Sequence, residues 1–271
     1  MPGVILVVLD HADAAGGLLA AAQRLGGLCG ARRINAMVVR APPETMLSPS
    51  EEVLTASREA ALRAAEADRA AAVRAAFDAW AADLPAGIAG EWTDIDGIAE
   101  LLVEERGRRA DFIVIERPER HDYATSWHAL RAALFATDRP ILVVPRHCGA
   151  GFGRRVAIAW RDDERAVKAV LTALRCLADC EQVFVLAGAR AGAAPPRLPP
   201  VLMEHGIAAE LHVLPIGGGP FGAALLHEAH RLGADMLVMG AYQHTPLREF
   251  LLGGVTRHVL NHADLPVLLR H

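Results

Sequence analysis

The sequence predicts an α/β fold in two tandem copies, each an open five-stranded parallel sheet flanked by helices. Three observations lead to this prediction. Short continuous apolar runs such as Val4–Leu9 alternate with longer helical patterns, as buried parallel strands and their crossover helices do. A Gly-rich break at 149–153 interrupts the alternation, which then starts again. Two segments far apart in the chain also match each other residue by residue. The predicted domains are residues 1–148 and 154–271.

The first half of the chain holds the pattern of five strands and four helices. Strands are predicted at 4–9, 33–39, 90–95, 112–115 and 141–144, and helices at 13–28, 49–82, 98–108 and 127–135. Ser48 and Ser50 are candidate N-caps of the long helix, and the acidic residues at 51–52 favour its positive end. Strands that alternate with helices in this way form right-handed βαβ units.

The second half repeats the alternation with shorter connections. Strands are predicted at 156–160, 183–186, 211–214, 236–239 and 267–269, and helices at 164–177, 201–205, 221–232 and 255–261. The triple glycine at 217–219 is interpreted as a flexible connector, since no Lys-Ser/Thr follows it as in a P-loop.

The strongest evidence for a duplication is the match between the fourth and fifth strands of the two halves. Ala110–Ile115 corresponds to Ala234–Met239, and Arg139–Val144 corresponds to Leu265–Leu269. Each fifth strand follows a proline, which fits a position that needs no backbone N–H. A repeat of this length implies two domains rather than a solenoid.

The composition excludes several classes of protein. The chain of 271 residues is 52% hydrophobic and 22% charged, with a formal net charge of −4 and a pI near 6.3. This is enough apolar sequence for a packed core, and without an excess of basic residues we expect no nucleic-acid partner. No apolar run reaches the roughly 18 residues of a membrane span, and the run at 4–9 lacks the basic start of a signal peptide. We therefore expect a cytoplasmic protein that does not enter a membrane.

The four cysteines have neither a disulfide-scaffold spacing nor a zinc-ribbon spacing. Cys176 and Cys180 share a predicted helix face, where they are either buried thiols or half of a metal clip. Nothing nearby in the sequence supplies further ligands, so no metal site is predicted from them.

The candidate binding site follows the fourth strand of the second half, because ligands of open parallel sheets bind beyond the carboxyl ends of the strands. Glycines at a strand end and at a helix start let backbone amides approach an anion. The segment from Gly240 to Thr256 has this pattern, and its candidate phosphate-contacting residues are Gly240, Gln243, His244, Gly253, Gly254 and Thr256. The alternative is that the glycines serve turns and helix packing and that His244 is a solvated loop residue.

This segment resembles the signature of the universal stress protein family, in which Gly, two residues, Gly, nine residues and Gly-Ser/Thr bind ATP phosphates. The match continues through 257–260 and 263–268. The resemblance covers the whole chain as a tandem pair and is weakest over the helix at 49–82. It implies a Rossmann-like fold of the adenine nucleotide alpha hydrolase type and a non-catalytic stress-response protein. It also implies ATP or another adenine nucleotide as the ligand of the second domain, with Mg²⁺ accompanying the nucleotide as the only metal.

The second copy departs from the signature at three positions. Gln243 stands where the family has its second glycine, and Gly254 stands in place of Ser/Thr, so the hydroxyl of Thr256 is the substitute. Arg161 occupies the end of the first strand, where the family places an Asp near the adenosine. Arg161 either binds phosphate or pairs with a nearby Asp.

The first copy departs in the opposite sense. It keeps the acidic residue as Asp10, which is otherwise a helix N-cap or a loop carboxylate, but has Glu116–Glu119 in place of the glycines. The carboxylate of Glu116 would repel phosphate, and Pro118 provides no amide donor. Each copy thus keeps part of the signature.

Apolar residues complete the predicted second site. Val238, together with Met239, is expected to back it, and Trp160 is expected either to form a packed wall of the cleft or to stack on a base. The resemblance also implies that the two halves pair through their fifth strands as an intramolecular pseudo-dimer, which would cover two edge strands. A homodimer of the whole chain stays open.

Catalytic motifs such as Gly-x-Ser-x-Gly or His-Glu-x-x-His are absent, so the sequence does not predict an enzyme. Two alternatives stay open. One is a slow ATP hydrolase, for which Asp162 or Asp163 would hold the metal. The other is a nucleotide-free interaction module that presents the helix at 49–82 to a partner.

Overall fold

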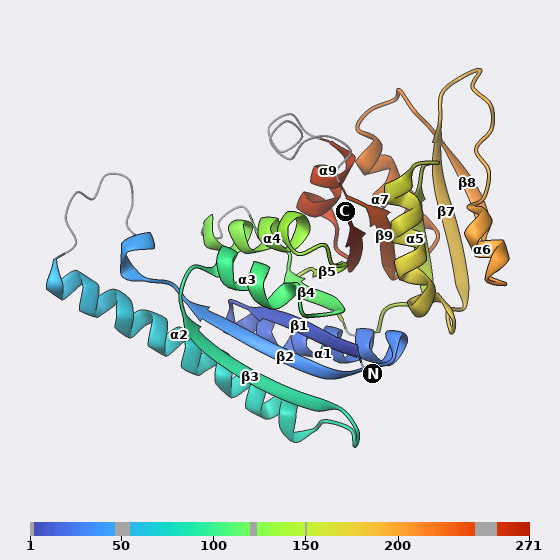
Figure 1. Cartoon of the computed structure of the whole chain (residues 1–271). Helices are drawn as coiled ribbons and strands as arrows, with labels where there is room; N and C mark the ends of the chain where they lie inside the picture. The colour runs from blue at the N-terminus through green and yellow to red at the C-terminus, as the bar shows by residue number, and fades with distance from the viewer. Residues whose placement is uncertain (1–2, 47–54, 120–123, 150, 242–253) are drawn as a thin grey trace.

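The ten strands of the described residues form one continuous sheet with helices on both faces (Figure 1). The computed structural model describes residues 3–46, 55–119, 124–149, 151–241 and 254–271. Strand order across the sheet is β3-β2-β1-β4-β5-β10-β9-β6-β7-β8. The first half of the chain therefore supplies one side of the sheet and the second half supplies the other.

The first half folds as the alternation of strands and helices predicts. Its elements are β1 (Gly3–Leu9), α1 (Ala12–Cys29), β2 (Ala31–Arg40), a short 3-10 turn (Pro43–Thr45), α2 (Ala56–Ala82), β3 (Ala89–Asp96), α3 (Ala99–Gly107), β4 (Phe112–Glu116), α4 (Ala124–Ala136) and β5 (Ile141–Val144). The described part of α2 begins at Ala56 with Thr55 as its N-cap, whose hydroxyl accepts from the Arg58 amide. The predicted caps Ser48 and Ser50 lie outside the described residues.

The second half repeats this order. Its elements are β6 (Arg155–Trp160), α5 (Glu164–Leu177), β7 (Gln182–Ala189), α6 (Pro200–Glu204), β8 (Glu210–Pro215), α7 (Phe221–Arg231), β9 (Met236–Gly240), α9 (Val255–His262) and β10 (Val267–Arg270). Cys180 lies beyond the end of α5, so the expectation that it shares a helix face with Cys176 is wrong. Both thiols are free, and burial raises the pKa of Cys176 to about 12.

The duplication extends to individual hydrogen bonds. The Asp111 amide donates to the Val4 carbonyl at 2.8 Å, and the Asp235 amide donates to the Arg155 carbonyl at 2.8 Å. The carboxylate of Asp111 accepts from the Val4 amide, and that of Asp235 accepts from the Arg155 amide. In each half, the aspartate before the fourth strand thus forms hydrogen bonds, through its backbone and its side chain, with the start of the first strand. The two halves thus share a hydrogen-bonding pattern as well as an order of elements.

The two halves join through their fifth strands. β5 and β10 pair antiparallel, with Val143 opposite Val267 and Leu142 opposite Leu268, whereas the other strand pairs of the sheet are parallel. The predicted two separate sheets are therefore one ten-stranded sheet, because pairing the fifth strands satisfies the hydrogen-bonding edge of each half.

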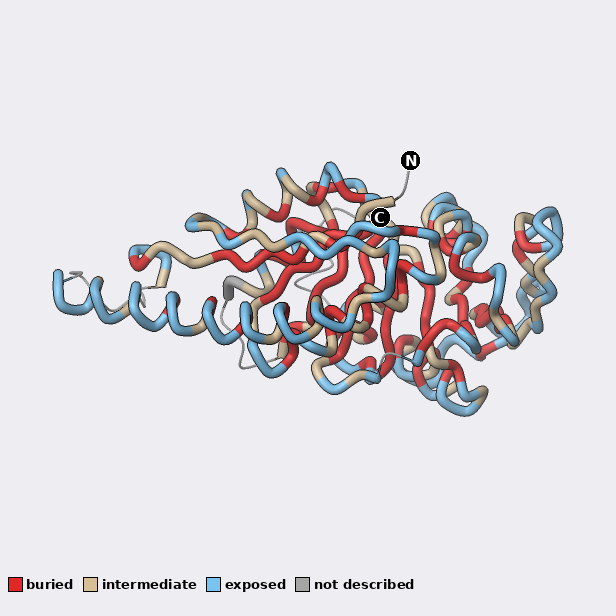
Figure 2. The backbone as a smooth tube through the Cα atoms, turned by 90° about the horizontal axis from the view of Figure 1, so that it is seen from below, coloured by how far each residue is buried: buried red, intermediate tan, exposed pale blue. Residues whose placement is uncertain are grey.

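The core has two layers, one on each face of the sheet. Helices α1, α2, α5 and α6 pack on one face, and α3, α4, α7 and α9 pack on the other. Each layer contains residues of both halves, so the apolar core runs through the junction. Figure 2 shows buried residues concentrated in the strands, whereas α2 is mostly exposed and buries only Glu66, Ala70, Val73 and Phe77.

Candidate functional site

Each half of the molecule has a cleft at the carboxyl ends of its strands, where its first and fourth strands lie side by side. The two clefts differ about tenfold in volume. The first, which we call the first cleft, encloses about 40 Å³, and the second cleft encloses about 380 Å³. The second is in the size range of small-molecule sites, while the first holds little more than one or two water molecules.

The second cleft is built from the ends of three neighbouring strands and the first turns of two helices. β9, β6 and β7 form its floor, and α5 and α9 begin at its margin. Its lining residues are Ala159, Trp160, Arg161, Asp163, Arg165, Ala166, Leu186, Ala187, Gly188, Pro196, Ile216, Phe221, Leu225, Met239, Gly240, Ala241, Val255 and Thr256.

The apolar part of this lining gathers at the β7 side. Gly188 at the end of β7 leaves room for two large side chains, since a Cβ there would lie 2.8 Å from both Ile216 Cδ1 and Phe221 Cζ. Leu186 and Leu225 continue the apolar surface. This side of the cleft therefore suits a flat or aliphatic apolar group.

The charged part of the lining lies at the start of α5. Asp163 caps this helix, its Oδ1 accepting from the Arg165 amide at 3.1 Å and from the Ala166 amide at 2.9 Å. Its other oxygen pairs with Arg161 Nη2 at 2.6 Å. Burial alone would raise the pKa of Asp163, but these hydrogen bonds outweigh burial and hold the pKa below its usual value. Asp163 is therefore ionised at neutral pH.

Two arginines and one carboxylate line the second cleft. The side chain of Arg161 is 61% exposed, so its pair with Asp163 is a surface pair that contributes little and exchanges partners easily. Arg165 lines the cleft and has no carboxylate partner among the described residues. The described lining of the second cleft thus has an excess of positive charge.

Gly240, the last residue of β9, is required by packing. A Cβ at this position would lie 3.0 Å from the Arg165 carbonyl carbon and 3.1 Å from the Ala166 nitrogen. Both contacts are to backbone atoms, which have little freedom to move. The glycine lets the first turn of α5 approach the strand end, and this explains its presence without any ligand.

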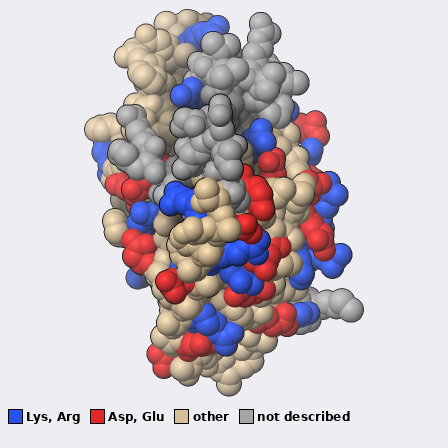
Figure 3. Space-filling model, turned by 90° about the vertical axis from the view of Figure 1, so that its left-hand side faces the viewer, with Lys and Arg blue, Asp and Glu red and all other residues tan. Residues whose placement is uncertain are grey.

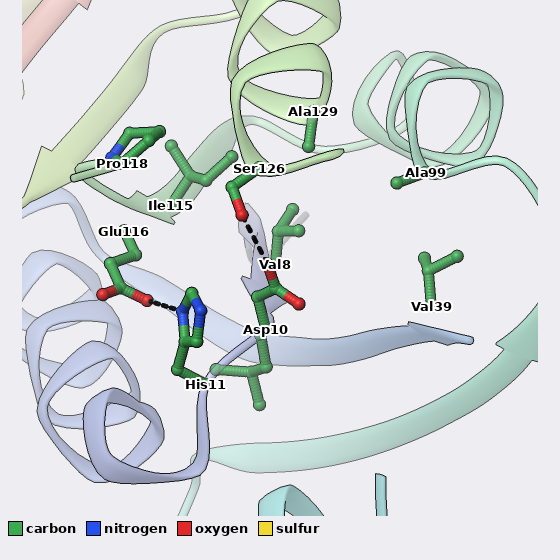
Figure 4. Close-up of a pocket in the computed structure, with 11 residues that line it drawn as sticks. Val8, Asp10, His11, Val39, Ala99, Ile115, Glu116, Pro118, Ser126 and Ala129 are labelled. Carbon is green, nitrogen blue, oxygen red and sulfur yellow. Dashed lines mark hydrogen bonds and ion pairs between the residues drawn. The ribbon is translucent and has the colours of Figure 1, made fainter. Parts of the chain in front are cut away.

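The first cleft is filled by its own charged side chains. Arg69 reaches across from α2 and donates to Asp10 Oδ1 at 3.1 Å and to the carbonyls of Asp10 and Val39 at 2.9 and 2.6 Å. It also pairs with Glu66 at 2.8 Å. On the other side of Asp10, the Ser126 hydroxyl donates to Oδ2 at 2.6 Å (Figure 4). Both oxygens of the Asp10 carboxylate therefore accept hydrogen bonds from other side chains of the protein.

A second charged group closes the β4 side of the first cleft. Glu116, at the end of β4, accepts from His11 Nδ1 at 2.9 Å and pairs with Arg146, which follows β5 (Figure 4 shows the first of these contacts). The hydrogen bond to Glu116 raises the pKa of His11, against burial, and the Asp10 charge adds to this effect. Glu116 occupies the position that Gly240 has in the second half.

Comparisons with known proteins bear on the family and the fold of the chain. Residues 204–271 match the family model of the universal stress protein family. A universal stress protein from Archaeoglobus fulgidus DSM 4304 is similar in fold, with a TM-score of 0.72 and 14% identity over 99% of this chain and 96% of that chain. A functionally unknown protein from Pseudomonas aeruginosa PAO1 has a TM-score of 0.61 and 17% identity over 99% of this chain and 92% of that chain. No curated protein sequence matches the chain.

The match to the universal stress protein family model thus lies within the second half of the chain, and it includes the described residues Gly240, Gly254 and Thr256. Over nearly its whole length the chain shares its α/β fold with a universal stress protein of known structure, and this confirms the fold that the sequence resemblance predicts.

The predicted site residues of the second half fall into four groups. Gly240, Trp160, Arg161 and Thr256 line the second cleft. Val238 is fully buried and points away, because adjacent residues of a strand face opposite sides, and its neighbour Met239 lines the cleft instead. Gly254 is the N-cap of α9, just outside the lining, and offers no side chain to cap that helix. Gln243, His244 and Gly253 lie outside the described residues.

Sequence reasoning missed the residues that distinguish the two clefts. Arg69, His11 and Arg146 are not part of any signature, and Arg69 comes from a helix far away in the chain. Of the two alternatives for Asp10, the helix N-cap is wrong, because α1 is capped at His11, and Asp10 is a loop carboxylate that is ion-paired with Arg69. The sequence could have predicted Arg165 as a site residue, since it lies in the first turn of the helix that follows the first strand of the second half.

On the face shown in Figure 3, basic and acidic side chains are interspersed. The described residues contain no group of three or more His, Cys, Asp or Glu placed to hold a metal ion. Within the same part of the chain, no helix has the length and apolar character needed to span a bilayer.

Proposed function

We propose that this chain is a cytoplasmic stress-response protein whose second cleft binds an adenine nucleotide and whose first cleft binds none. The observation that carries the proposal is the contrast between an open cavity of about 380 Å³ and one of about 40 Å³ at equivalent positions of a duplicated fold. Binding rather than turnover would be the activity of the protein.

The chemistry of the second cleft supports a nucleotide in particular. An apolar surface around Phe221 and Ile216 suits a base, and the cationic start of α5 suits an anionic group. The first turn of α9 begins at Gly254 without a side-chain cap, and Thr256 lies in the lining of the cleft. The positive end of a helix at this margin favours a phosphate there.

A slow ATP hydrolase is supported less well. Such an enzyme would use Asp162 or Asp163 to hold a metal, but Asp163 already caps α5 and pairs with Arg161. Asp162 is exposed and does not line the cleft. A nucleotide-free interaction module, the other alternative, would rely on the exposed surface of α2.

One set of measurements separates these three functions. Freshly purified protein is denatured, and the supernatant is analysed by anion-exchange chromatography for released nucleotide. The refolded or nucleotide-free protein is then tested with ATP and Mg²⁺ for a thermal shift and for phosphate release. We expect a shift at millimolar ATP without steady phosphate release. No nucleotide and no shift would overturn the binding proposal, and phosphate release that disappears in Asp162→Ala would support the hydrolase.

We also propose that the β5–β10 junction makes the two halves an intramolecular pseudo-dimer. The supporting observation is that this pairing already satisfies one edge of each half. Sedimentation equilibrium of the full chain tests whether a homodimer forms as well. A monomer is expected.

A further inference from the structure

The strand order of the second half fixes how a nucleotide would lie in the second cleft. β6 lies between β9 and β7 in the sheet. The β9 side adjoins the first turn of α9, with Gly240 and Thr256 in the lining, and the β7 side carries the apolar residues around Phe221. The middle position, at the end of β6, belongs to Trp160 and Arg161.

This order divides a bound nucleotide into three parts, provided that the nucleotide binding proposed above is correct. The 5′-phosphate belongs on the β9 side, near the start of α9, and the base belongs on the apolar β7 side. The ribose connects the two and must therefore cross the end of β6. Its hydroxyl groups come to lie on the side where Arg161 and Arg165 line the cleft.

Arginine is the wrong residue for a plain ribose. A guanidinium only donates hydrogen bonds, whereas a carboxylate accepts them from both ribose hydroxyls. Dinucleotide-binding folds show the same contrast, in which an acidic residue binds the 2′-hydroxyl and an Arg accommodates a 2′-phosphate. The first half of this chain has Asp10 at the end of β1, the position that Arg161 occupies at the end of β6.

The local charges point the same way. Arg161 and Arg165 flank one carboxylate, that of Asp163, and one oxygen of that carboxylate is occupied by the α5 amides. Because the Arg161 side chain is 61% exposed, it can turn from Asp163 to a ligand phosphate at small cost. A phosphate held by two guanidinium groups would gain charge-assisted, bidentate hydrogen bonds.

We propose that the second cleft selects nucleotides with an additional phosphate on the 2′ or 3′ position of the ribose. Arg161 and Arg165 bind that phosphate, and they make the cleft specific for a ribose-phosphorylated ligand over an ordinary 5′-nucleotide.

The test is a calorimetric titration of the full chain with three adenosine ligands. Adenosine 2′,5′-bisphosphate and adenosine 3′,5′-bisphosphate are compared with ADP, which carries the same number of phosphate groups but both at the 5′ position. We expect at least one bisphosphate to bind about tenfold more tightly than ADP, and the preference to weaken with salt.

Two variants assign the effect to the proposed residues. Arg161→Ala should weaken the binding of the bisphosphates about tenfold more than the binding of ADP, and so remove the preference. Arg175→Ala, which changes an exposed arginine of the same helix region more than two turns from the cleft, should keep it. Melting curves check that both variants are folded.

The outcomes are distinct. Equal affinity for ADP and both bisphosphates would overturn the specificity while leaving nucleotide binding in place. A preference that persists in Arg161→Ala would overturn the role of Arg161. Binding of none of the three ligands would overturn the nucleotide-binding proposal itself, and the specificity with it.

Discussion

The two clefts of this molecule share a backbone design and differ in what occupies the strand ends. In the first, Glu116 stands at the end of the fourth strand and Asp10 at the end of the first, and both carboxylates are paired within the protein. In the second, the same positions hold Gly240 and Arg161, and the space between them is open. The side chains at the two strand ends thus account for part of the difference between the clefts.

The difference also has a source in the elements that follow the second strands. The first half has α2, a long helix that brings Arg69 to Asp10, and the second half has the five-residue α6 in the same place in the order of elements. No side chain from α6 lines the second cleft among the described residues. The long helix therefore supplies the cation that pairs with Asp10 at the first cleft and with Glu66 on the helix itself.

Removing that cation should have the largest effect. Arg69→Ala leaves Glu66 and Asp10 without their main partner in a mostly buried position, since the Arg69 side chain is only 22% exposed. Breaking such a pair costs about 3 kcal/mol of unfolding free energy. Urea denaturation of the full chain measures this loss.

The matched control lies on the same helix. Arg63 forms an exposed pair with Glu59 one turn away, so Arg63→Ala should cost only about 0.3 kcal/mol. A similar loss in both variants would show that Arg69 has no special part in closing the first cleft.

The pH dependence of stability sharpens the comparison further. The pKa of His11 is raised above 6.5 by its hydrogen bond to Glu116, by Asp10 and by Glu116 charge, despite burial and the nearby Arg146. Its contribution is therefore complete below about pH 6.5 and is lost as the pH rises through the raised value.

His11→Ala should accordingly lower the unfolding free energy by about 1 kcal/mol more at pH 6 than at pH 8. Denaturant titrations of both proteins at the two pH values give the difference. An equal loss at the two values would mean that the charge of His11 contributes nothing to the first cleft.

A smaller effect is expected from the carboxylate of Asp163 in the second cleft. Asp163→Asn keeps an oxygen to cap α5 but removes the negative charge that pairs with Arg161. The affinity for an anionic nucleotide should rise about threefold, as measured by calorimetric titration. Asp162→Asn, an exposed neighbour outside the lining, serves as the control and should leave the affinity unchanged. Weaker binding in Asp163→Asn would show that Asp163 itself holds the ligand.

The sequence predicted the elements far better than the site. Apolar runs such as Val4–Leu9 and the repeated Ala-Asp segments fix strands and duplication locally, so the structure reproduces them. The strand residues that point into the cleft were harder to assign. The choice between Val238 and Met239 depends on the face of the sheet on which the cleft lies. The alternation of a strand would have settled it once the helix layers were known.

The ion pairs around the first cleft could not be predicted from local sequence patterns. It depends on Arg69 meeting Asp10 across 59 positions of sequence and on Arg146 meeting Glu116 across 30. Such pairs arise only when the helix and strands have taken their places. What the sequence did show was the chemical mismatch, an acid where a phosphate loop would need glycine.

The number of nucleotides bound per chain tests most directly whether only the second cleft is a binding site. It is measured by equilibrium dialysis of the full chain with radiolabelled ATP in the presence of Mg²⁺. We expect one equivalent per chain, and a loss of affinity of about 30-fold in the double variant Arg161→Glu, Arg165→Glu, which reverses both charges of the second cleft. Two equivalents per chain, or one equivalent that survives this double change, would contradict the assignment of the site to the second cleft.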